Sequence, residues 1–441
     1  MLIAWFHHCS QIVFRELILT HQIIISGAGI AGLTAALALH AHGFDRIVIL
    51  ERAHDIQPLG SGINLLPHAV RELDALDILD DLIPLCIQTK ELFYMNHRGD
   101  RIWHEVRGTD AGYRWPQLSI HRGWLQNQLY QKVVSLLGAN AVRTGMEVVN
   151  VQSSGRRAIA ICKKRSTGET VNFEGDLVIG ADGIRSSVRR VIVPAEGPPP
   201  CNGMVIFRGA TWGSSFLTGR SMIIAGDGVR KIVLYPMAHR TDSDQVLLNW
   251  AAAVPENPGA GYSHGDWNIP VAPSKFAPEF EGWNLAGVQP SVLMQNSPDT
   301  FVYPMVDREP LKSWSKNGNI VLIGDAAHAM YPVGSNGATQ SIIDASAIAY
   351  YLGRYPRLID ALSAYEADRQ VKMTKLQLAN RQQGPEVVIN IANERAPNGF
   401  DDPENVFKPG ELQEISDRYT KTSSMEFSKV NEPSPYMCMV M

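Results

Sequence analysis

The segment QIIISGAGIAG, residues 22–32, places the strongest constraint on the fold of this chain. Its run Ile23–Ile25 is continuously apolar, which predicts a strand buried on both faces. Apolar residues then recur at three- and four-residue spacing over 31–43, which predicts a helix that ends at Gly43. A second apolar strand follows at Ile47–Glu51. Together these elements predict a βαβ unit, the building block of a parallel sheet.

The glycines between the first strand and the helix fit the pattern G-x-G-x-x-G. Gly27 permits a tight turn, Gly29 lets the backbone approach a pyrophosphate, and Gly32 lets the helix pack closely on the strand. The free N–H groups of the helix start, around Ala31, are suited to phosphate. The spacing therefore predicts a dinucleotide site, the alternative being a sheet turn with incidental glycines.

Glu51 stands at the end of the second strand, where a carboxylate that binds ribose is expected. An acid at this position favours a free ribose diol, as in NAD or FAD, over a 2′-phosphate. We include the adjacent Arg52 among the candidate cofactor residues. A solvated acid at a strand end is the alternative for Glu51, and the motif alone does not separate NAD from FAD.

The composition excludes several classes of protein. The 441 residues carry a net charge of −4, with 45% hydrophobic and 19% charged residues, as is usual for globular proteins. No basic face indicates nucleic acid, and no run of 18 apolar residues predicts a membrane span. Five scattered cysteines without metal-ligand spacing predict neither a disulfide framework nor a metal site. We therefore expect a cytoplasmic protein that binds small molecules.

Two later apolar strands also end in a glycine and an aspartate. They lie in DLVIGADGIRSSVRR, residues 176–190, and in GNIVLIGDAAHAMYPVGSNGATQSIIDA, residues 318–345. Between them, residues 201–303 hold short β-like runs separated by turn residues, which predicts an antiparallel sheet. Helical patterns continue to about residue 395, and we expect a loosely packed tail from Pro397.

The three motifs, in this order and spacing, resemble the single-component FAD-dependent aromatic hydroxylases, such as para-hydroxybenzoate and salicylate hydroxylases. The resemblance covers about residues 22–420. Most of that family reads closer to P-x-x-G-Q-G-x-N in the last loop, where this chain has PVGSNG. With SIHRGWLQNQL, FRGATW, LANRQQGPE and ERAPNGF, this loop is similar to the 5-methylphenazine-1-carboxylate 1-monooxygenase branch.

The resemblance implies an α/β fold with a discontinuous Rossmann-like FAD-binding domain, a mid-chain mixed or antiparallel substrate domain, and C-terminal helices. We predict a terminal extension over 1–20 and a last region of helices and loose tail over 361–441. The FAD-binding domain is predicted over 21–80, 105–200 and 304–360. The substrate domain is predicted over 81–104 and 201–303.

The resemblance also implies roles for single residues. Asp325 is expected to bind the ribityl chain of FAD, with a helix cap as the alternative. The helix start after it favours negative charge, so we expect the loop to support the flavin ring through Pro332, Gly334, Ser335, Asn336 and Gly337.

Three more residues are cofactor candidates by resemblance. Arg122 is expected on the phosphate side of FAD, Asp182 between FAD and the nicotinamide site, and Gly62 at the flavin. The alternatives are a surface charge, a turn aspartate and a simple loop, respectively. We expect His328 to be a packed residue and not a catalytic base.

The activity implied is that of an FAD-dependent monooxygenase. Tightly bound FAD, reduced by NADH or NADPH, would react with O₂ to a C4a-hydroperoxide that hydroxylates an aromatic or heteroaromatic small molecule. The alternatives are a flavin oxidase or dehydrogenase on the same scaffold and a non-catalytic FAD-fold protein. Arg208 is a candidate to pair a substrate carboxylate, and Tyr235 to bind and help deprotonate a phenol. We expect a monomer or homodimer.

Overall fold

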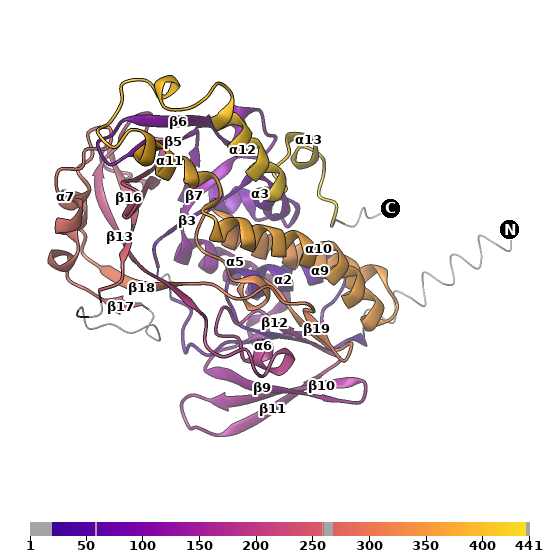
Figure 1. Cartoon of the computed structure of the whole chain (residues 1–441). Coiled ribbons are helices and arrows are strands. Elements are labelled where there is room, and N and C mark those ends of the chain that lie inside the picture. The colour runs from indigo at the N-terminus through magenta and orange to yellow at the C-terminus, as the bar shows by residue number, and fades with distance from the viewer. Residues whose placement is uncertain (1–19, 58–59, 258, 260–267, 438–441) are drawn as a thin grey trace.

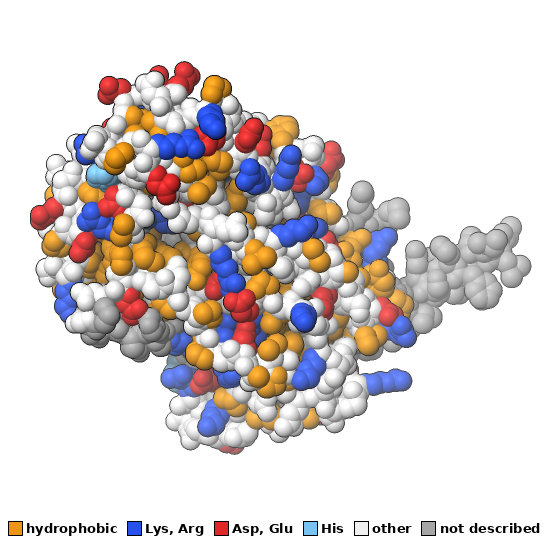
Figure 2. Space-filling view, in the orientation of Figure 1, with side chains coloured by type: hydrophobic (Ala, Val, Ile, Leu, Met, Phe, Trp, Pro, Cys, Tyr) orange, Lys and Arg blue, Asp and Glu red, His pale blue; other side chains and the backbone are white. Residues whose placement is uncertain are grey.

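The computed structural model describes residues 20–57, 60–257, 259 and 268–437 of the chain. All but the last residue of the predicted N-terminal extension therefore lie outside the described residues. Within the described part, no helix is long and apolar enough to cross a membrane. Lys and Arg side chains alternate with Asp and Glu over the face in Figure 2, without a continuous basic stripe.

A six-stranded sheet forms the centre of the nucleotide-binding part. Its order is β19 (Ser315–Lys316), β20 (Ile320–Leu322), β12 (Leu177–Gly180), β1 (Ile23–Ser26), β2 (Ile47–Leu50) and β8 (Val142–Arg143). All neighbours are parallel except β19 and β20. The apolar strand before Gly324 therefore lies in the same sheet as the strand before Gly27, as the sequence predicts.

Helices cover this sheet. Those nearest to it are α2 (Ile30–Ala41), α5 (Arg122–Leu137), α6 (Ser187–Ile192), α8 (Asp325–His328), α9 (Asn336–Arg354) and α10 (Leu358–Arg381). Helix α2 packs against α5 and α9, and α9 packs against α10 (Figure 1). The first helix of the βαβ unit thus contacts a helix that begins about 300 residues later.

An eight-stranded sheet forms the second layer. Its order is β17 (Ile269–Pro270), β18 (Thr300–Val306), β13 (Cys201–Ser214), β16 (Gln245–Pro255), β15 (Lys231–His239), β14 (Ser221–Gly226), β5 (Glu91–Asn96) and β6 (Arg101–Val106). Its strands are antiparallel except for the parallel pair β14 and β5. One face forms a core with α7 (Pro290–Gln295), whereas the other turns toward the nucleotide-binding part.

Two small antiparallel sheets complete the β-structure. Strands β3 (Gly62–Leu65), β7 (Gln117–His121) and β4 (Cys86–Thr89) form one of them. Its strands β7 and β4 contact β15 of the large sheet. Strands β9 (Met146–Ser154), β10 (Arg157–Lys164) and β11 (Thr170–Gly175) form a separate ribbon (Figure 1). Short helices α3 (Pro67–Ala75) and α4 (Leu79–Leu82) follow β3.

The prediction of a loosely packed tail after Pro397 is wrong. Helices α11 (Val387–Arg395), α12 (Glu411–Thr422) and α13 (Phe427–Val430) form the C-terminal region. Beyond α12, Met425, Val430 and Tyr436 are buried. The tail is polar in composition, but single well-spaced apolar residues suffice to pack it.

The predicted division into domains stays a prediction. Strands from both proposed substrate segments, 81–104 and 201–303, meet in the eight-stranded sheet. Strands β6 and β18 run a few residues past the proposed boundaries.

Candidate active site

The three sequence motifs meet at the carboxyl edge of the parallel sheet. Gly27 has φ +105°, and a Cβ there would stand 2.6 Å from the carbonyl oxygen of Ala181. Gly324 has φ +58°, and its Cβ would stand 3.1 Å from Cβ of Ala31. Both contacts require glycine, because any side chain would meet the neighbouring motif.

The first motif leaves a free helix start. Helix α2 has no acidic residue in its first turn and no side-chain cap. A Cβ at Gly29 would meet nothing within 4 Å, whereas one at Gly32 would stand 2.0 Å from the carbonyl oxygen of Gly27. Close packing therefore fixes Gly32, and Gly29 faces open space in which a pyrophosphate could approach the N–H groups.

Glu51 directly follows β2. Its Oε2 accepts a hydrogen bond from the backbone N–H of Ala28 at 2.8 Å, and its Oε1 accepts one from Ala53 at 2.8 Å. The carboxylate is thus fixed beside the glycine turn at the position expected for a ribose. Arg52 is exposed next to it.

Asp325 begins helix α8. Its side chain is exposed to solvent on one side, and protein encloses the rest of its surroundings. Burial raises the pKa of its carboxyl, whereas His328 and Arg122 lower it. An exposed carboxylate in such surroundings is suited to bind hydroxyl groups of a ligand, because charged acceptors make strong hydrogen bonds.

The loop after Asp325 leads into helix α9. Ser335, the residue before that helix, has φ +59°, a strained conformation for a residue other than glycine. Pro332 is exposed, and a Cβ at Gly337 would meet nothing within 4 Å. Helix α9 has no acid in its first turn and no side-chain cap. Its N–H groups are therefore available to an anionic ring.

The side chain of Asn336 points into the protein. It is buried: Nδ2 donates to the oxygens of Gly334 and Tyr419 at 2.9 Å each, and Oδ1 accepts from Gln340. Both ends of the amide are thus used inside the protein, which leaves only the backbone of Asn336 for a cofactor.

A buried polar network joins Gly324, just before helix α8, to helix α9. Asp344 on α9 accepts hydrogen bonds from the N–H of Gly324 at 2.9 Å and from Nε of Arg369 at 2.8 Å. Its Oδ2 also lies 2.5 Å from Nε2 of His328. Burial alone would raise the pKa of Asp344, but His328 and Arg369 hold it below its usual range. His328 is therefore a packed partner of Asp344, as expected.

Arg122 and Asp182 take different positions. Arg122 starts α5, is exposed, and lies close enough to Asp325 and Arg208 to lower the pKa of each. Asp182 accepts at Oδ2 from the N–H groups of Ser187 at 2.8 Å and Val188 at 3.4 Å. This is the turn-stabilising role, although Oδ1 of Asp182 is buried without a partner.

These residues fit FAD. A free helix start and an open glycine suit the pyrophosphate, and Glu51 suits a ribose. Asp325 suits the ribityl hydroxyls, and the start of α9 suits the flavin ring. One extended FAD molecule, bound at its two ends, would account for both glycine-rich loops, at 27–32 and at 331–337.

The face of the eight-stranded sheet that turns toward this site carries Arg208 and Tyr235. Tyr235 lies opposite Asn249, whose Oδ1 accepts from the N–H of Gly62 at 2.7 Å. A Cβ at Gly62 would stand 2.8 Å from the hydroxyl oxygen of Tyr235. Arg208 lies over the ring of Tyr303 on the same face. Trp250, in contrast, points to the other face and donates to Ser297.

A cavity of about 420 Å³ lies farther along that face. Met222 and Ile224 of β14 form its floor. Gly334 and Ser335 border it; they belong to the loop of residues 331–336, which we call the flavin-side loop after its expected role. Helix α12 and its flanks close it from the other side. Its polar and aromatic lining includes Tyr94, Trp103, Arg107, Tyr113, Gln117 and Tyr419.

The sequence did not identify these lining residues. The alternation in β5 could have placed Tyr94 on the same face as Leu92. Tyr419 carries no local signal, because it lies in a segment whose packing depends wholly on distant residues.

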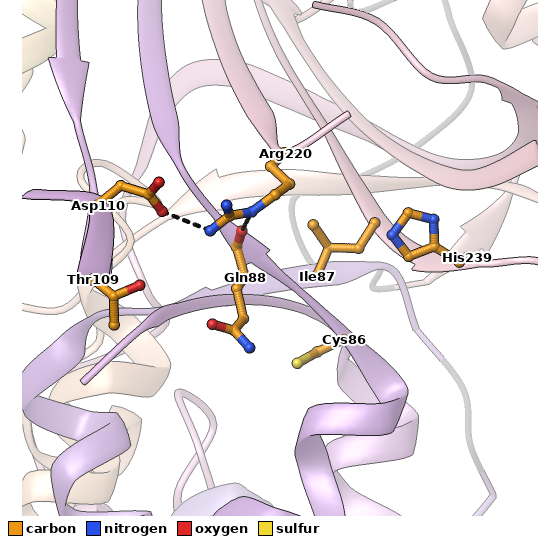
Figure 3. Close-up of a pocket in the computed structure, with 7 residues that line it drawn as sticks. All are labelled: Cys86, Ile87, Gln88, Thr109, Asp110, Arg220 and His239. Carbon is orange, nitrogen blue, oxygen red and sulfur yellow. Dashed lines mark hydrogen bonds and ion pairs between the residues drawn. The ribbon is translucent and has the colours of Figure 1, made fainter. Parts of the chain in front are cut away.

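A larger hollow of about 540 Å³ lies away from all three motifs (Figure 3). Arg220 there donates to Asp110 at 2.6 Å and to the carbonyl oxygen of Gln88 at 2.7 Å. Burial raises the pKa of the nearby Cys86 to about 12, so its thiol is not an activated nucleophile. We assign no role to this hollow.

Comparisons with known proteins agree with this site. The family described as FAD binding domain matches residues 20–247 and 304–377. Phenazine 1,6-dicarboxylic acid hydroxylase PhzS from Lysobacter antibioticus is 40% identical over 363 residues, 82% of this chain and 89% of that protein. 3-Hydroxybenzoate 6-hydroxylase 1 from Aquipseudomonas alcaligenes is 29% identical over 371 residues, 82% of this chain and 88% of that protein.

A solved structure shares the fold. The crystal structure of CtdE in complex with FAD and substrate has a TM-score of 0.72 and 19% identity, and covers 93% of this chain and 99% of that chain. Fold, site and matches thus define an FAD-dependent oxidoreductase.

The chain belongs to the FAD-binding-domain family, and its function is that of an FAD-dependent aromatic monooxygenase, for which NAD(P)H is the typical reductant. The resemblance inferred from the three motifs is confirmed. The oxidase alternative is not favoured.

Proposed function

We propose that the enzyme hydroxylates a fused, nitrogen-containing aromatic carboxylate of the phenazine type. The observation that carries this proposal is the cavity of about 420 Å³ beside Gly334 and Ser335. It is larger than a single ring requires, and aromatic and apolar side chains line it together with polar ones such as Arg107 and Gln117. The name of the relative at 40% identity, a phenazine dicarboxylic acid hydroxylase, supports the same substrate class.

The register of the large sheet supports an elongated substrate. Arg208, Ala251, Val233, Ile224 and Tyr94 are consecutive partners across five strands. Strands lie about 4.8 Å apart, so this row spans about 19 Å. Arg208 does not line the cavity, whereas Ile224 and Tyr94 at the other end of the row do. A three-ring acid held by Arg208 would extend toward Ile224, whereas a single-ring acid would end farther from the cavity.

Arg208 is suited to hold the carboxylate. No hydrogen bond or acid partner is found for its guanidinium among the described residues, and its Nε is buried without a partner. Burial lowers the pKa of Arg208, against the opposing effects of Tyr235 and Tyr303, yet a guanidinium stays charged. A partly buried cation without an anion is unfavourable, so a substrate carboxylate would stabilise Arg208.

Tyr235 is suited to donate a hydrogen bond to the substrate. Burial raises its pKa well above the usual value, while Arg208 and a hydrogen bond from Asn64 act in the opposite direction. The hydroxyl therefore stays protonated at neutral pH and is available as a donor to the substrate. Because Asn64 Oδ1 accepts from Ser119 at 2.7 Å, its amide group is oriented toward this role.

Bound FAD, once reduced by NAD(P)H, would supply the activated oxygen. The chain supplies position and the exclusion of water. Arg208 would fix one end of the substrate, Tyr235 would orient the reacting ring, and the apolar floor of Met222 and Ile224 would keep the site dry.

The activity can be tested with the purified holoenzyme. NADH and NADPH oxidation would be followed with phenazine-1-carboxylate, phenazine-1,6-dicarboxylate, unsubstituted phenazine and 3-hydroxybenzoate, under ¹⁸O₂. We expect ¹⁸O in the product of a phenazine carboxylate, and the product mass shows whether a carboxyl group is lost. Incorporation into 3-hydroxybenzoate alone would contradict the proposed substrate class.

Arg208→Gln should raise KM for a phenazine carboxylate by about 10-fold or more, because a hydrogen bond to a charged group is lost. It should leave KM for unsubstituted phenazine, if that is accepted, nearly unchanged. Arg101→Gln is the matched control, since Arg101 is exposed and lies over Phe93 on the opposite face of the same sheet. Equal effects of both substitutions on KM would contradict the assignment of Arg208 to the substrate carboxylate.

A further inference from the structure

Tyr419 of helix α12 lines the proposed substrate cavity and also contacts the flavin-side loop. It lines the cavity beside Gly334 and Ser335. It is also wedged between two glycines, since a Cβ at Gly334 or at Gly384 would stand within 2.6 Å of its ring. Neither glycine tolerates a side chain while the ring is there, so the ring and the loop have complementary shapes.

The hydroxyl of Tyr419 is used entirely by this loop and its support. It accepts from Nδ2 of Asn336 at 2.9 Å, and its proton faces the carbonyl oxygen of Val333 at 3.2 Å and Oδ1 of Asn380 at 2.8 Å. Asn380 in turn donates to the carbonyl oxygens of Tyr331 and Val333. Four loop positions, 331, 333, 334 and 336, are thus fixed by one tyrosine and its partner.

Burial keeps this hydroxyl neutral. It raises the pKa of Tyr419 well above the usual value, and Glu386 acts in the same direction, whereas the hydrogen bond with Asn336 opposes it. A neutral hydroxyl can donate and accept at the same time, which the arrangement requires.

The loop needs such support. Ser335 has a left-handed backbone conformation, which costs free energy unless the surroundings enforce it. The loop's own residues supply little: within it, Asn336 bonds Gly334 and the N–H of Val333 bonds the oxygen of Tyr331. The enforcing contacts come from α10 through Asn380 and from α12 through Tyr419.

We propose that Tyr419 is a positioning residue, which holds the 331–336 loop in the conformation that receives the flavin ring. Because Tyr419 also forms a wall of the cavity, a substrate that packs against α12 would tighten the same loop. This second part rests on the proposed function, whereas the first part does not depend on which substrate enters.

The test compares Tyr419→Phe with Tyr113→Phe. Both variants lose one hydroxyl from the cavity wall, but Tyr113 donates to the carbonyl oxygen of Met425 at 2.7 Å and not to the loop. Hydrogen exchange of residues 331–337 would be measured in the apoprotein and in the FAD-loaded chain, together with FAD affinity and the midpoint potential of bound FAD.

In Tyr419→Phe we expect loop amides to exchange about 5- to 20-fold faster, because hydrogen bonds that close the loop are lost. FAD should bind more weakly and show a shifted potential, and the loaded enzyme should release more H₂O₂ per NADH. Tyr113→Phe should leave loop exchange and potential as in the wild type.

Unchanged loop exchange and potential in Tyr419→Phe would overturn the proposal and leave Tyr419 a packing residue. Equal changes in both variants would overturn it too, since the effect would then belong to the cavity wall in general. Faster loop exchange with no activity on any phenazine would support the role of Tyr419 and reject only the proposed substrate.

Discussion

The glycine turn at Gly27–Gly32 and the loop at Tyr331–Asn336 both lead into a long helix, yet different forces hold them. The first turn is fixed mainly by backbone packing, most closely of Gly32 on Gly27 and of Gly27 on Ala181. The second is fixed by side chains from elsewhere in the chain, above all Asn380 and Tyr419. The expected pyrophosphate end of the site is therefore held mainly by backbone atoms, and the expected flavin end mainly by side chains.

This difference has a consequence for mutations. At the first turn, substitutions of the motif's own glycines should disturb the cofactor most. At the second, substitutions far away should do so, because the network through Asp344, Arg369 and Gln340 joins Gly324 to Asn336.

The largest effect is expected for Asp344→Asn, the centre of that network. Removing one partner of a buried ion pair costs about 3–5 kcal/mol, measured as the free energy of unfolding in urea. The control is Asp360→Asn, since Asp360 is paired with Arg357 on the surface and should have little effect. A loss below about 1 kcal/mol for Asp344→Asn would show that the network does not support the flavin end.

The same residue predicts a pH dependence. The pKa of Asp344 is lowered in the folded chain, so its contribution is present above the unfolded pKa, near 4, and is lost as pH falls through the folded value. Unfolding free energies of the wild type should therefore fall between pH 5 and pH 3. In Asp344→Asn this part of the decline should be missing.

A pair of alanine substitutions tests the local character of the first turn. Gly32→Ala places a Cβ 2.0 Å from a backbone oxygen and should destabilise the chain by about 3 kcal/mol. Gly29→Ala meets no atom in the protein and should leave stability within about 0.5 kcal/mol. It should nevertheless weaken FAD binding by about 10-fold or more, because the Cβ occupies the approach to the pyrophosphate. If Gly29→Ala binds FAD normally, the pyrophosphate is not at this turn.

A small effect on stability is expected for Asp325→Asn, and it should be favourable. The pKa of Asp325 is raised in the fold, so the charged form is disfavoured and stability is lost as pH rises through the folded value. Because the side chain is exposed, the apoprotein should gain at most about 1 kcal/mol at pH 7.

FAD binding should weaken in Asp325→Ala, in contrast to the gain in stability expected for Asp325→Asn. Without the carboxylate, FAD affinity should fall by about 10- to 100-fold, measured by fluorescence titration. An unchanged affinity would contradict the ribityl assignment of Asp325.

Much of the fold could be predicted from residue patterns. The run Ile23–Ile25 and the apolar strand before Gly324 are buried on both faces, and such strands can belong only to a covered parallel sheet. Their shared sheet follows from that requirement together with the family resemblance. The packing of α12 could not be predicted, because Leu412 is its one buried residue and its position depends on the large sheet.

The site residues also divide into those that the sequence predicted and those that it could not place. Glu51 was predicted because it ends a recognisable strand, and Asp325 through the family resemblance of the motif that follows another strand. Asn336 was predicted as part of the loop that supports the flavin ring; its side chain is directed inward by Gln340 and Tyr419, which leaves its backbone for that role. The face of Arg208 and Tyr235 could not be chosen from alternation alone, since the turn residues around them leave the register open.

The sequence by itself determined the nucleotide-binding turn, because that turn depends on a few residues at short spacing, whose backbone conformations and free N–H groups are local properties. The class of cofactor and the class of reaction followed from the sequence only through the resemblance of three ordered motifs to a known family. Only the tertiary structure decided which side chains form the cavity of about 420 Å³ and which tyrosine holds the 331–336 loop. Such contacts join residues more than 80 positions apart, as between Val333 and Tyr419, and only the packing of the sheet and helices brings them together.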